Sequence, residues 1–195
     1  MKFIIATHNT HKLDELRRIL APLGIAADID PALPEADETG VTFAENAFIK
    51  ADEACKFTGL PAIADDSGLT VDALGGEPGV YSARYAPVGS RKATVLKKLE
   101  GLPTAERGAA FVSAVCCVFP NGDTVTAEGV CRGHIGEAPR GEGGFGYDPI
   151  FVTENGKTFA ELSPAEKDAV SHRGRALRAF AEKLANYLEE HHVDE

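Results

Sequence analysis

The sequence predicts an α/β protein in which a mixed β-sheet is flanked by helices. Short apolar runs with the character of buried strands are followed by segments whose apolar residues recur every three or four positions, as in amphipathic helices. Further along, residues 109–119 and 125–131 have strand character and are separated by Pro-Asn-Gly-Asp, a strong hairpin signal. Two antiparallel strands next to βα units indicate a sheet with both strand directions.

The first part of the chain predicts two strands and two helices. Residues 2–6 and 25–29 have strand character, and a helix is predicted over residues 10–23 between them. One face of this helix carries Leu13, Leu16, Leu20 and Leu23, with Ile19 beside it. Thr42 and Glu45 have capping-box spacing and predict a helix to about residue 58, where Gly59 and Pro61 stop it. Its apolar face is expected to hold Phe43, Ala44, Ala47, Phe48, Ala51, Ala54 and Cys55, while Asn46 and Lys50 project together from an adjoining face.

The later part of the chain predicts three further helices and a short strand. A helix is expected over residues 90–101, with Val95, Leu96 and Leu99 buried, and a strand over residues 150–152. Ser163-Pro164-Ala165-Glu166 combines an N-cap, a proline at the first helical position and a glutamate three residues after the cap, and so marks a helix start. Ser171 is placed to cap a last helix with Leu177, Phe180, Leu184 and Leu188 on one side. His191 and His192 are expected to belong to an unstructured end without a role.

Composition limits the classes of protein that the chain can represent. Its 195 residues are enough for one domain or two closely joined lobes, and an apolar content of 44% can form a real core. The net charge of −10 argues against non-specific nucleic-acid binding and favours a carboxylate-bound divalent cation beside any anionic ligand. No apolar run has the length of a membrane span or a signal peptide, so a cytoplasmic protein is expected. The four cysteines form no C-x-x-C pair and are expected to be buried, reduced thiols.

The stretch from Pro61 to Gly68 carries the most concentrated chemical signal. An apolar run, residues 61–64, meets Asp65-Asp66-Ser67, and Gly68 follows at once. A strand that ends in acids and a glycine turn is a typical way for an α/β sheet to place reactive groups at strand ends. In an extended chain the two neighbouring aspartates point to opposite sides, so at most one would face a ligand. The alternative is that both are turn residues that accept hydrogen bonds from the backbone.

Three predicted helix starts carry cations, which are unfavourable at the positive end of a helix dipole. They are Lys12, Lys167 and the pair His172-Arg173. Three such coincidences favour a polyanionic or polar ligand held by helix ends, although Lys12 alone could be a solvated surface residue.

Residues 141–149 form the most glycine-rich loop. Phe145 and Tyr147 stand between glycines and could stack on a planar ligand, with Asp148 accepting hydrogen bonds, or could fold back into the core. The loop is not a Walker motif, because it lacks Gly-Lys-Ser/Thr. The earlier acidic loop, residues 34–40, is either a solvated surface or the source of a metal ligand.

Together these segments resemble the inosine triphosphate pyrophosphatase family. The matching pieces, in the family's order, are Thr7-x-Asn9-x-x-Lys12, Phe43-x-Glu45-Asn46-Ala47-x-x-Lys50-Ala51, Ala64-Asp65-Asp66-Ser67-Gly68-Leu69, Pro78-Gly79-Val80-Tyr81-Ser82-Ala83-Arg84-Tyr85, Gly143-Gly144-Phe145-Gly146-Tyr147-Asp148-Pro149 and Ser171-His172-Arg173-Gly174. They span nearly the whole chain, and their combination is highly specific. The chain departs from the pattern at His8, where members commonly carry glycine, and a side chain there could narrow the phosphate loop.

The resemblance implies one nucleoside triphosphate pyrophosphatase domain over residues 1–195, with an elongated mixed sheet, helices around it and two lobes with a cleft between them. It also implies a homodimer and Mg²⁺-dependent hydrolysis of the xanthosine, inosine and deoxyinosine triphosphates XTP, ITP and dITP to the monophosphate and pyrophosphate. A nucleotide-binding sensor without catalysis and a pyrophosphatase of the Maf type are the alternative functions.

Roles follow position by position from the same resemblance. Asp66 would be the general base and a magnesium ligand, Lys50 would act in catalysis at the phosphates, and Glu38 would be the second metal ligand, with Glu45 as its alternative. The other expected phosphate contacts are Thr7, Asn9, Lys12 and Ser67. The residues expected to hold the base are Phe145, Gly146, Tyr147, Asp148, Lys167, His172 and Arg173.

Overall fold

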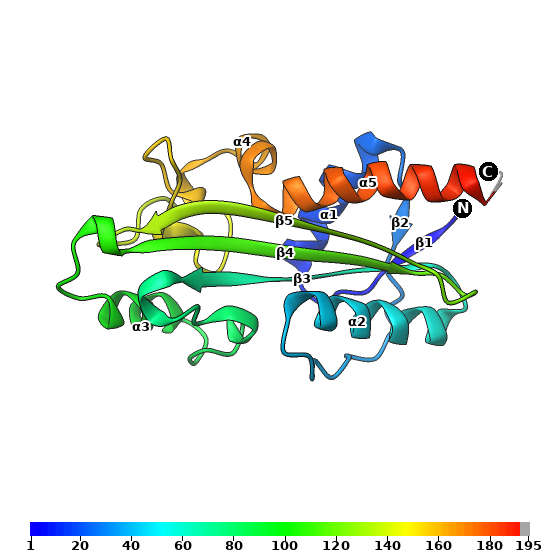
Figure 1. Cartoon of the computed structure of the whole chain (residues 1–195), viewed down its shortest axis with the longest axis horizontal. Coiled ribbons are helices and arrows are strands. Elements are labelled where there is room, and N and C mark those ends of the chain that lie inside the picture. Colours follow the sequence, from blue (N-terminus) through cyan, green and yellow to red (C-terminus); the bar gives the residue numbers. More distant parts are fainter. Residues whose placement is uncertain (192–195) are drawn as a thin grey trace. The chain divides into compact units, whose positions relative to one another are not determined.

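The computed structural model describes residues 1–191, so the expectation for His192 lies outside the described residues. Within this range the chain forms a six-stranded sheet in the order β2-β1-β3-β4-β5-β6 (Figure 1). The strands are β1 (Phe3–Ile5), β2 (Ala27–Asp28), β3 (Ala62–Val71), β4 (Gly108–Val118), β5 (Thr124–Ile135) and β6 (Phe151–Val152). Since β1 is parallel to β2 and β3 whereas β5 and β6 are antiparallel, the predicted mixed α/β sheet is confirmed.

The helices begin close to the predicted caps. They are α1 (Thr10–Leu20), α2 (Phe43–Thr58), α3 (Arg91–Lys98), α4 (Pro164–Val170) and α5 (His172–Glu190). Both predicted capping boxes are present, at Thr42 with Glu45 and at Ser163 with Glu166. The predicted helix over residues 10–23 ends early, because residues 21–23 tighten into a 3₁₀ turn that contains Pro22, and Leu23 is exposed. His191 is not unstructured as expected, since its ring stacks on Tyr187 and contacts the carbonyl of that residue; that it has no role stays a prediction.

The chain divides into two compact units that are interleaved along the sequence. The first unit contains residues 1–66, 113–129 and the chain from Arg173 onward, and the second contains residues 67–112 and 130–172. Strands β3, β4 and β5 each contribute one end to each unit. Neither unit is therefore a contiguous segment of the sequence.

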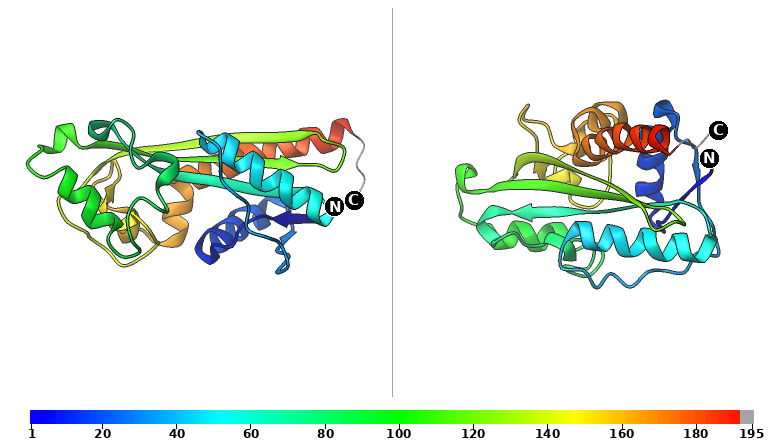
Figure 2. Two further views of the ribbon diagram at one scale, coloured as in Figure 1. Left: turned by 90° about the horizontal axis from the view of Figure 1, so that it is seen from below. Right: turned by 45° about the vertical axis from the view of Figure 1, so that its right-hand side comes forward.

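In the first unit the sheet is covered on both faces (Figures 1 and 2). Helices α1 and α5 lie on one face, where Phe3 and Ile5 of β1 share a buried cluster with helix side chains. Helix α2 lies on the other face, where Ile4 packs in a cluster rich in alanine. This division follows from the alternation of side chains along a strand. The small residues that α2 presents to the sheet include Ala47, Ala51 and Ala54.

Two predictions for α2 and β4 can be compared with this packing. The predicted apolar face of α2 was too wide, because Ala44 and Phe48 are exposed. The expectation for the cysteines is confirmed, since all four are buried free thiols. Burial raises the pKa of Cys116 to about 12, which keeps this thiol protonated at neutral pH.

The second unit is built around its own aromatic cluster. Phe111 of β4 meets Phe151 edge to face at 4.8 Å and stacks on Phe159 at 5.4 Å. Val95 and Leu99 of α3 belong to the same buried cluster. Tyr147 of the glycine-rich loop, residues 141–149, belongs to the same cluster.

None of the helices within residues 1–191 has the combined length and apolar character that crossing a membrane requires.

Candidate functional site

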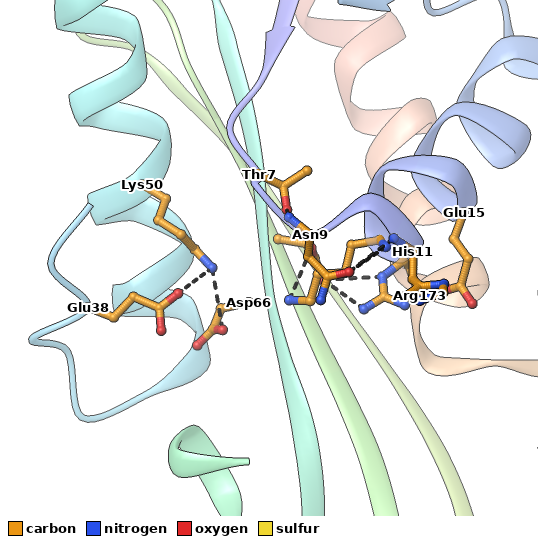
Figure 3. Close-up of polar contacts among 10 residues, drawn as sticks. Thr7, Asn9, His11, Glu15, Glu38, Lys50, Asp66 and Arg173 are labelled. Atoms are coloured by element: carbon orange, nitrogen blue, oxygen red, sulfur yellow. Dashed lines mark hydrogen bonds and ion pairs between the residues drawn. The ribbon is translucent and has the colours of Figure 1, made fainter. Parts of the chain in front are cut away.

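Asp65 and Asp66 lie in the middle of β3 and not at its end. The predicted end of the strand at residue 64 was wrong, because β3 continues through both acids to Val71. Both side chains are buried. The expected divergence of the two acids is confirmed, because Asp65 contacts Lys12 of α1 whereas Asp66 contacts Lys50 of α2. Figure 3 shows the contact between Asp66 and Lys50. The turn alternative was wrong, because the acids bind side-chain cations within a strand.

Asp65 belongs to a buried ion network that joins β3, α1 and α5. Its Oδ2 accepts hydrogen bonds from Nε and Nη2 of Arg173 at 3.3 and 3.2 Å, and its Oδ1 lies 3.4 Å from Nζ of Lys12. Nη1 of Arg173 donates to Glu15. Burial lowers the pKa of Arg173, but Asp65 and Glu15 outweigh it and the pKa lies above its usual value. Burial lowers the pKa of Lys12, and Asp65 opposes this only in part.

Glu15 was not among the residues singled out from the sequence. It lies three residues after Lys12 and one before Leu16, on the side of α1 that faces the core, and it is 6% exposed. The positions of Lys12, Glu15, Leu16 and Ile19 follow helical spacing, which is the signal that could have placed Glu15 beside Lys12. Arg173, the partner of Glu15 on α5, could not be found from helical spacing, because it lies in a different helix.

Asp66, Lys50 and Glu38 form a second charged cluster. Nζ of Lys50 lies 3.5 Å from Oδ1 of Asp66 and 2.8 Å from Oε1 of Glu38 (Figure 3). Burial raises the pKa of Asp66, and the ammonium groups of Lys50 and Lys12 oppose the rise without cancelling it. Burial lowers the pKa of Lys50, but the three carboxylates around it outweigh this effect and raise it. A carboxylate with a raised pKa beside a fixed cation is a suitable general base.

The same cluster has the oxygen donors that a magnesium ion requires. The Oδ2 atom of Asp66 is buried and has no hydrogen-bond partner, so one carboxylate oxygen is available for a cation. Within residues 1–191 no group of three or more Asp, Glu, His or Cys side chains is arranged to bind one metal ion, so the protein would supply fewer than three such ligands. Because Mg²⁺ commonly takes one or two carboxylates and completes its shell with water and phosphate oxygens, Asp66 and Glu38 fit this ion. Glu45 fits less well, since its Oε2 already accepts from the N–H groups of Val41 and Thr42.

Thr7 and Asn9 shape the loop that leads into α1. Oδ1 of Asn9 accepts hydrogen bonds from the N–H groups of His11 and Lys12 at 3.1 and 3.2 Å, which is an N-cap. Oγ1 of Thr7 accepts from the N–H of Asn9 at 3.2 Å (Figure 3). His8 is exposed in this loop. Ser67 follows Asp66 on β3, and the alternation of the strand directs it to the side of Asp65.

The second unit contains a compact group formed by Phe145, Asp148 and Lys167. Nζ of Lys167 lies 2.7 Å from Oδ2 of Asp148 and 5.0 Å from the centre of the Phe145 ring. Oδ2 of Asp148 also accepts from the N–H of Phe145 at 2.9 Å. The structure thus brings together three of the residues expected to hold the base. His172, another of them, is buried and stacks on Phe111 with a centroid distance of 4.6 Å.

Two interpretations of the sequence change with these contacts. The ring of Tyr147 is in the core, where its hydroxyl donates to the carbonyl of Ser82 at 2.8 Å, so only its backbone is left for a ligand. The cations at the helix starts each contact a carboxylate of the chain: Lys12 and Arg173 contact Asp65, and Lys167 contacts Asp148. Their positions therefore do not by themselves indicate a bound anion.

Replacing Gly144 by alanine is expected to disrupt the group around Asp148. Gly144 has φ +66°, and a Cβ atom there would lie 1.9 Å from Oδ2 of Asp148. We expect Gly144→Ala to lower the free energy of unfolding by about 1–3 kcal/mol and to raise KM for the nucleotide. Urea denaturation and steady-state kinetics measure the two effects. Gly156→Ala is the control, because Gly156 has φ +81° and open space around it; equal effects of the two variants on KM would contradict the expectation.

The buried hydroxyl of Tyr147 is expected to make the fold sensitive to alkali. Burial raises the pKa of Tyr147 to about 12, whereas a tyrosine in the unfolded chain ionises near 10. Above pH 10 the unfolded state therefore releases a proton that the folded state keeps, and stability falls by about 1.4 kcal/mol per pH unit until pH 12. Chemical denaturation at pH 9 and 11 should show a smaller loss for Tyr147→Phe than for the wild type. The control Tyr81→Phe, at an exposed ring, should leave the loss unchanged.

Comparison with known proteins agrees with the resemblance of the motifs. The sequence pattern of the Ham1 family matches residues 3–183. A protein of Symbiobacterium thermophilum named dITP/XTP pyrophosphatase is 48% identical over 192 residues, which cover 97% of this chain and 98% of the relative. A protein of Thermus thermophilus with the same name is 53% identical over 188 residues, covering 93% and 91%.

Solved structures lead to the same family. A HAM1 protein from Coxiella burnetii matches with a TM-score of 0.86 and 42% identity, covering 95% of this chain and 99% of the other. A nucleoside-triphosphatase, dITP/XTP pyrophosphatase, from Mycobacterium abscessus matches with a TM-score of 0.72 and 49% identity, covering 92% and 98%. The chain therefore belongs to the Ham1 family.

Proposed function

We propose that this chain is a nucleoside triphosphate pyrophosphatase that hydrolyses noncanonical purine nucleotides, namely XTP, ITP and dITP. The products would be the nucleoside monophosphate and pyrophosphate. The observation that carries the proposal is the buried carboxylate of Asp66, which has a raised pKa and one oxygen without a hydrogen-bond partner, beside Lys50 and Glu38. The names of the relatives support the substrate class. The homodimer, the cytoplasmic location and the removal of such nucleotides from the pool belong to the same proposal.

Asp66 and the residues around it would each have a role in the hydrolysis. Water attacks the triphosphate, the bond between the α and β phosphates breaks, and pyrophosphate leaves. Asp66 would orient the water and accept its proton, and the raised pKa of its carboxylate supports this role. Lys50, whose pKa is raised, stays protonated and neutralises charge on the phosphate oxygens. A magnesium ion held by Asp66 and Glu38 would neutralise further phosphate charge.

The group around Phe145 suits a purine base. The Phe145 ring offers a stacking surface, and Lys167 is held by Asp148 as a hydrogen-bond donor; His172 could supply another. A 6-keto purine presents an acceptor where adenine presents an amino donor. A donor left unpaired by adenine would cost about 1–3 kcal/mol, which corresponds to a preference of roughly 10- to 100-fold for the keto purine.

A product assay tests the proposal. With Mg²⁺ and dITP or XTP, the protein should release pyrophosphate and the monophosphate in equal amounts. Release of orthophosphate alone would exclude cleavage between the α and β phosphates, and nucleotide binding without turnover would favour a sensor. Modified or pyrimidine nucleotides in the same assay test the Maf-type alternative, which faster turnover of these than of dITP would support.

A further inference from the structure

We infer that Asn46 is a positioning residue whose amide oxygen holds the turn at residues 38–42 against α2 and thereby places the Glu38 carboxylate beside Lys50 and Asp66. The inference rests on the proposed function, because it assigns a task to Glu38 in that site. Within residues 1–191 the side-chain hydrogen bond of Asn46 goes to the backbone of Gly40, whereas Lys50, Glu38 and Asp66 contact one another.

The contact that carries the inference joins Asn46 to Gly40. Oδ1 of Asn46 accepts a hydrogen bond from the N–H of Gly40 at 2.8 Å, and the Asn46 side chain is completely buried. The next two N–H groups of the turn, those of Val41 and Thr42, donate to Oε2 of Glu45. Three successive N–H groups of the turn are thus bound by side chains from the first turn of α2.

The turn lies so close to the helix that only glycine fits at residue 40. A Cβ atom on Gly40 would lie 2.6 Å from Oδ1 of Asn46 and 2.7 Å from Cβ of Glu45. Glu38 is two residues away along the chain, and its Oε1 lies 2.8 Å from Lys50. Since Asn46 and Lys50 are one helical turn apart on α2, this helix holds both the backbone of the turn and the carboxylate that it presents.

The start of α2 does not by itself require Asn46. The capping box of Thr42 and Glu45 already satisfies the first N–H groups of the helix. Nδ2 of Asn46 is buried without a hydrogen-bond partner, which is unfavourable, and an apolar side chain of similar size would avoid that cost. The hydrogen bond to Gly40 is what an apolar residue could not supply. Asn46 thus orients the Glu38 carboxylate, a proposed metal ligand, through the backbone of the turn and without binding the metal itself.

The test combines variants on both sides of this contact. Asn46→Leu removes the acceptor at nearly constant size, and Gly40→Ala pushes the turn away from an intact Asn46. Asn46→Asp keeps an acceptor oxygen at the same position. Thr42→Ala is the matched control, because it removes the hydroxyl that accepts from the N–H of Glu45 and weakens the helix start, but leaves the Gly40 contact in place.

Two measurements that do not depend on turnover report the result. Amide hydrogen exchange of residue 40 follows the contact directly, and titration with Mn²⁺ alone, followed by electron paramagnetic resonance, gives the metal affinity. Asn46→Leu should speed exchange at Gly40 at least about tenfold and, with Gly40→Ala, should raise Kd for Mn²⁺ about 10- to 100-fold, as expected for a residue that orients a ligand. Asn46→Asp and Thr42→Ala should keep slow exchange and bind Mn²⁺ at least about as tightly as the wild type.

The inference would be overturned if Mn²⁺ binding to Asn46→Leu and Gly40→Ala stayed within about threefold of the wild type, or if Thr42→Ala weakened it equally. Should Asn46→Leu fail to fold, Gly40→Ala decides the question with the same two measurements. A wild-type protein that releases no pyrophosphate from dITP would contradict the proposed function alone. Faster exchange at Gly40 and weaker Mn²⁺ binding in the Asn46→Leu variant would still support the positioning role.

Discussion

The Asp66→Asn variant is expected to lose about 10²- to 10⁴-fold in kcat with dITP while remaining folded. Asparagine has nearly the shape of aspartate but cannot accept a proton from water, and it is a weaker ligand for magnesium. Asp66 has a raised pKa and lies beside Lys50 and Glu38 in the proposed site, so the variant lacks the proposed base. Steady-state release of pyrophosphate measures the loss.

The free energy of unfolding of Asp66→Asn shows whether lost activity comes from lost chemistry or from lost folding. Burial already disfavours the ionised form of Asp66, so a neutral side chain should change the free energy of unfolding by less than about 1 kcal/mol. The contact of Lys50 with Glu38, at 2.8 Å, does not involve Asp66 and is expected to persist in the variant. Asp14→Asn, which removes the same charge from an exposed position of α1, should leave kcat unchanged. Ordinary turnover by Asp66→Asn would remove this residue as the base.

The largest loss of stability is expected for Arg173→Met. The guanidinium of Arg173 is 1% exposed and holds the carboxylates of Asp65 and Glu15, which are buried themselves. Removing it takes the guanidinium away from two acids in the interior, and losing one partner of such a buried ionic group costs about 3–5 kcal/mol. Urea denaturation at neutral pH measures the free energy of unfolding.

Two further variants define what causes that loss. Arg175→Met removes an arginine from an exposed position of the same helix and should cost less than about 1 kcal/mol. Adding Glu15→Met to Arg173→Met removes one of the two buried carboxylates that Arg173 binds and should recover part of the stability. Equal stability of Arg173→Met and the wild type, or no recovery in the double variant, would contradict the account of a buried network.

The predicted helix starts were confirmed where the pattern involves residues close in sequence. The capping boxes at Thr42 and Ser163 involve residues three apart, so the same few side chains that form the pattern also form the hydrogen bonds. The 3₁₀ turn at residues 21–23 was missed because the apolar spacing continues to Leu23, whereas Pro22 interferes with regular helical hydrogen bonding. For Tyr147 the loop sequence left ligand contact and core packing open, and only the structure shows that its ring lies in the core.

The contrast is sharpest at Asp65 and Asp66. The amino-acid sequence alone was sufficient to identify these acids, to expect them on opposite sides of an extended chain, and to find Lys12 and Lys50 as cations of the site. Only the tertiary structure decided that β3 continues through them, that Arg173 and Glu15 surround Asp65, and that Asn46 holds the turn before α2. The physical reason is that alternation and capping depend on neighbours in sequence, whereas a buried charge is stabilised by whichever partner the fold brings to it, here one 108 residues away.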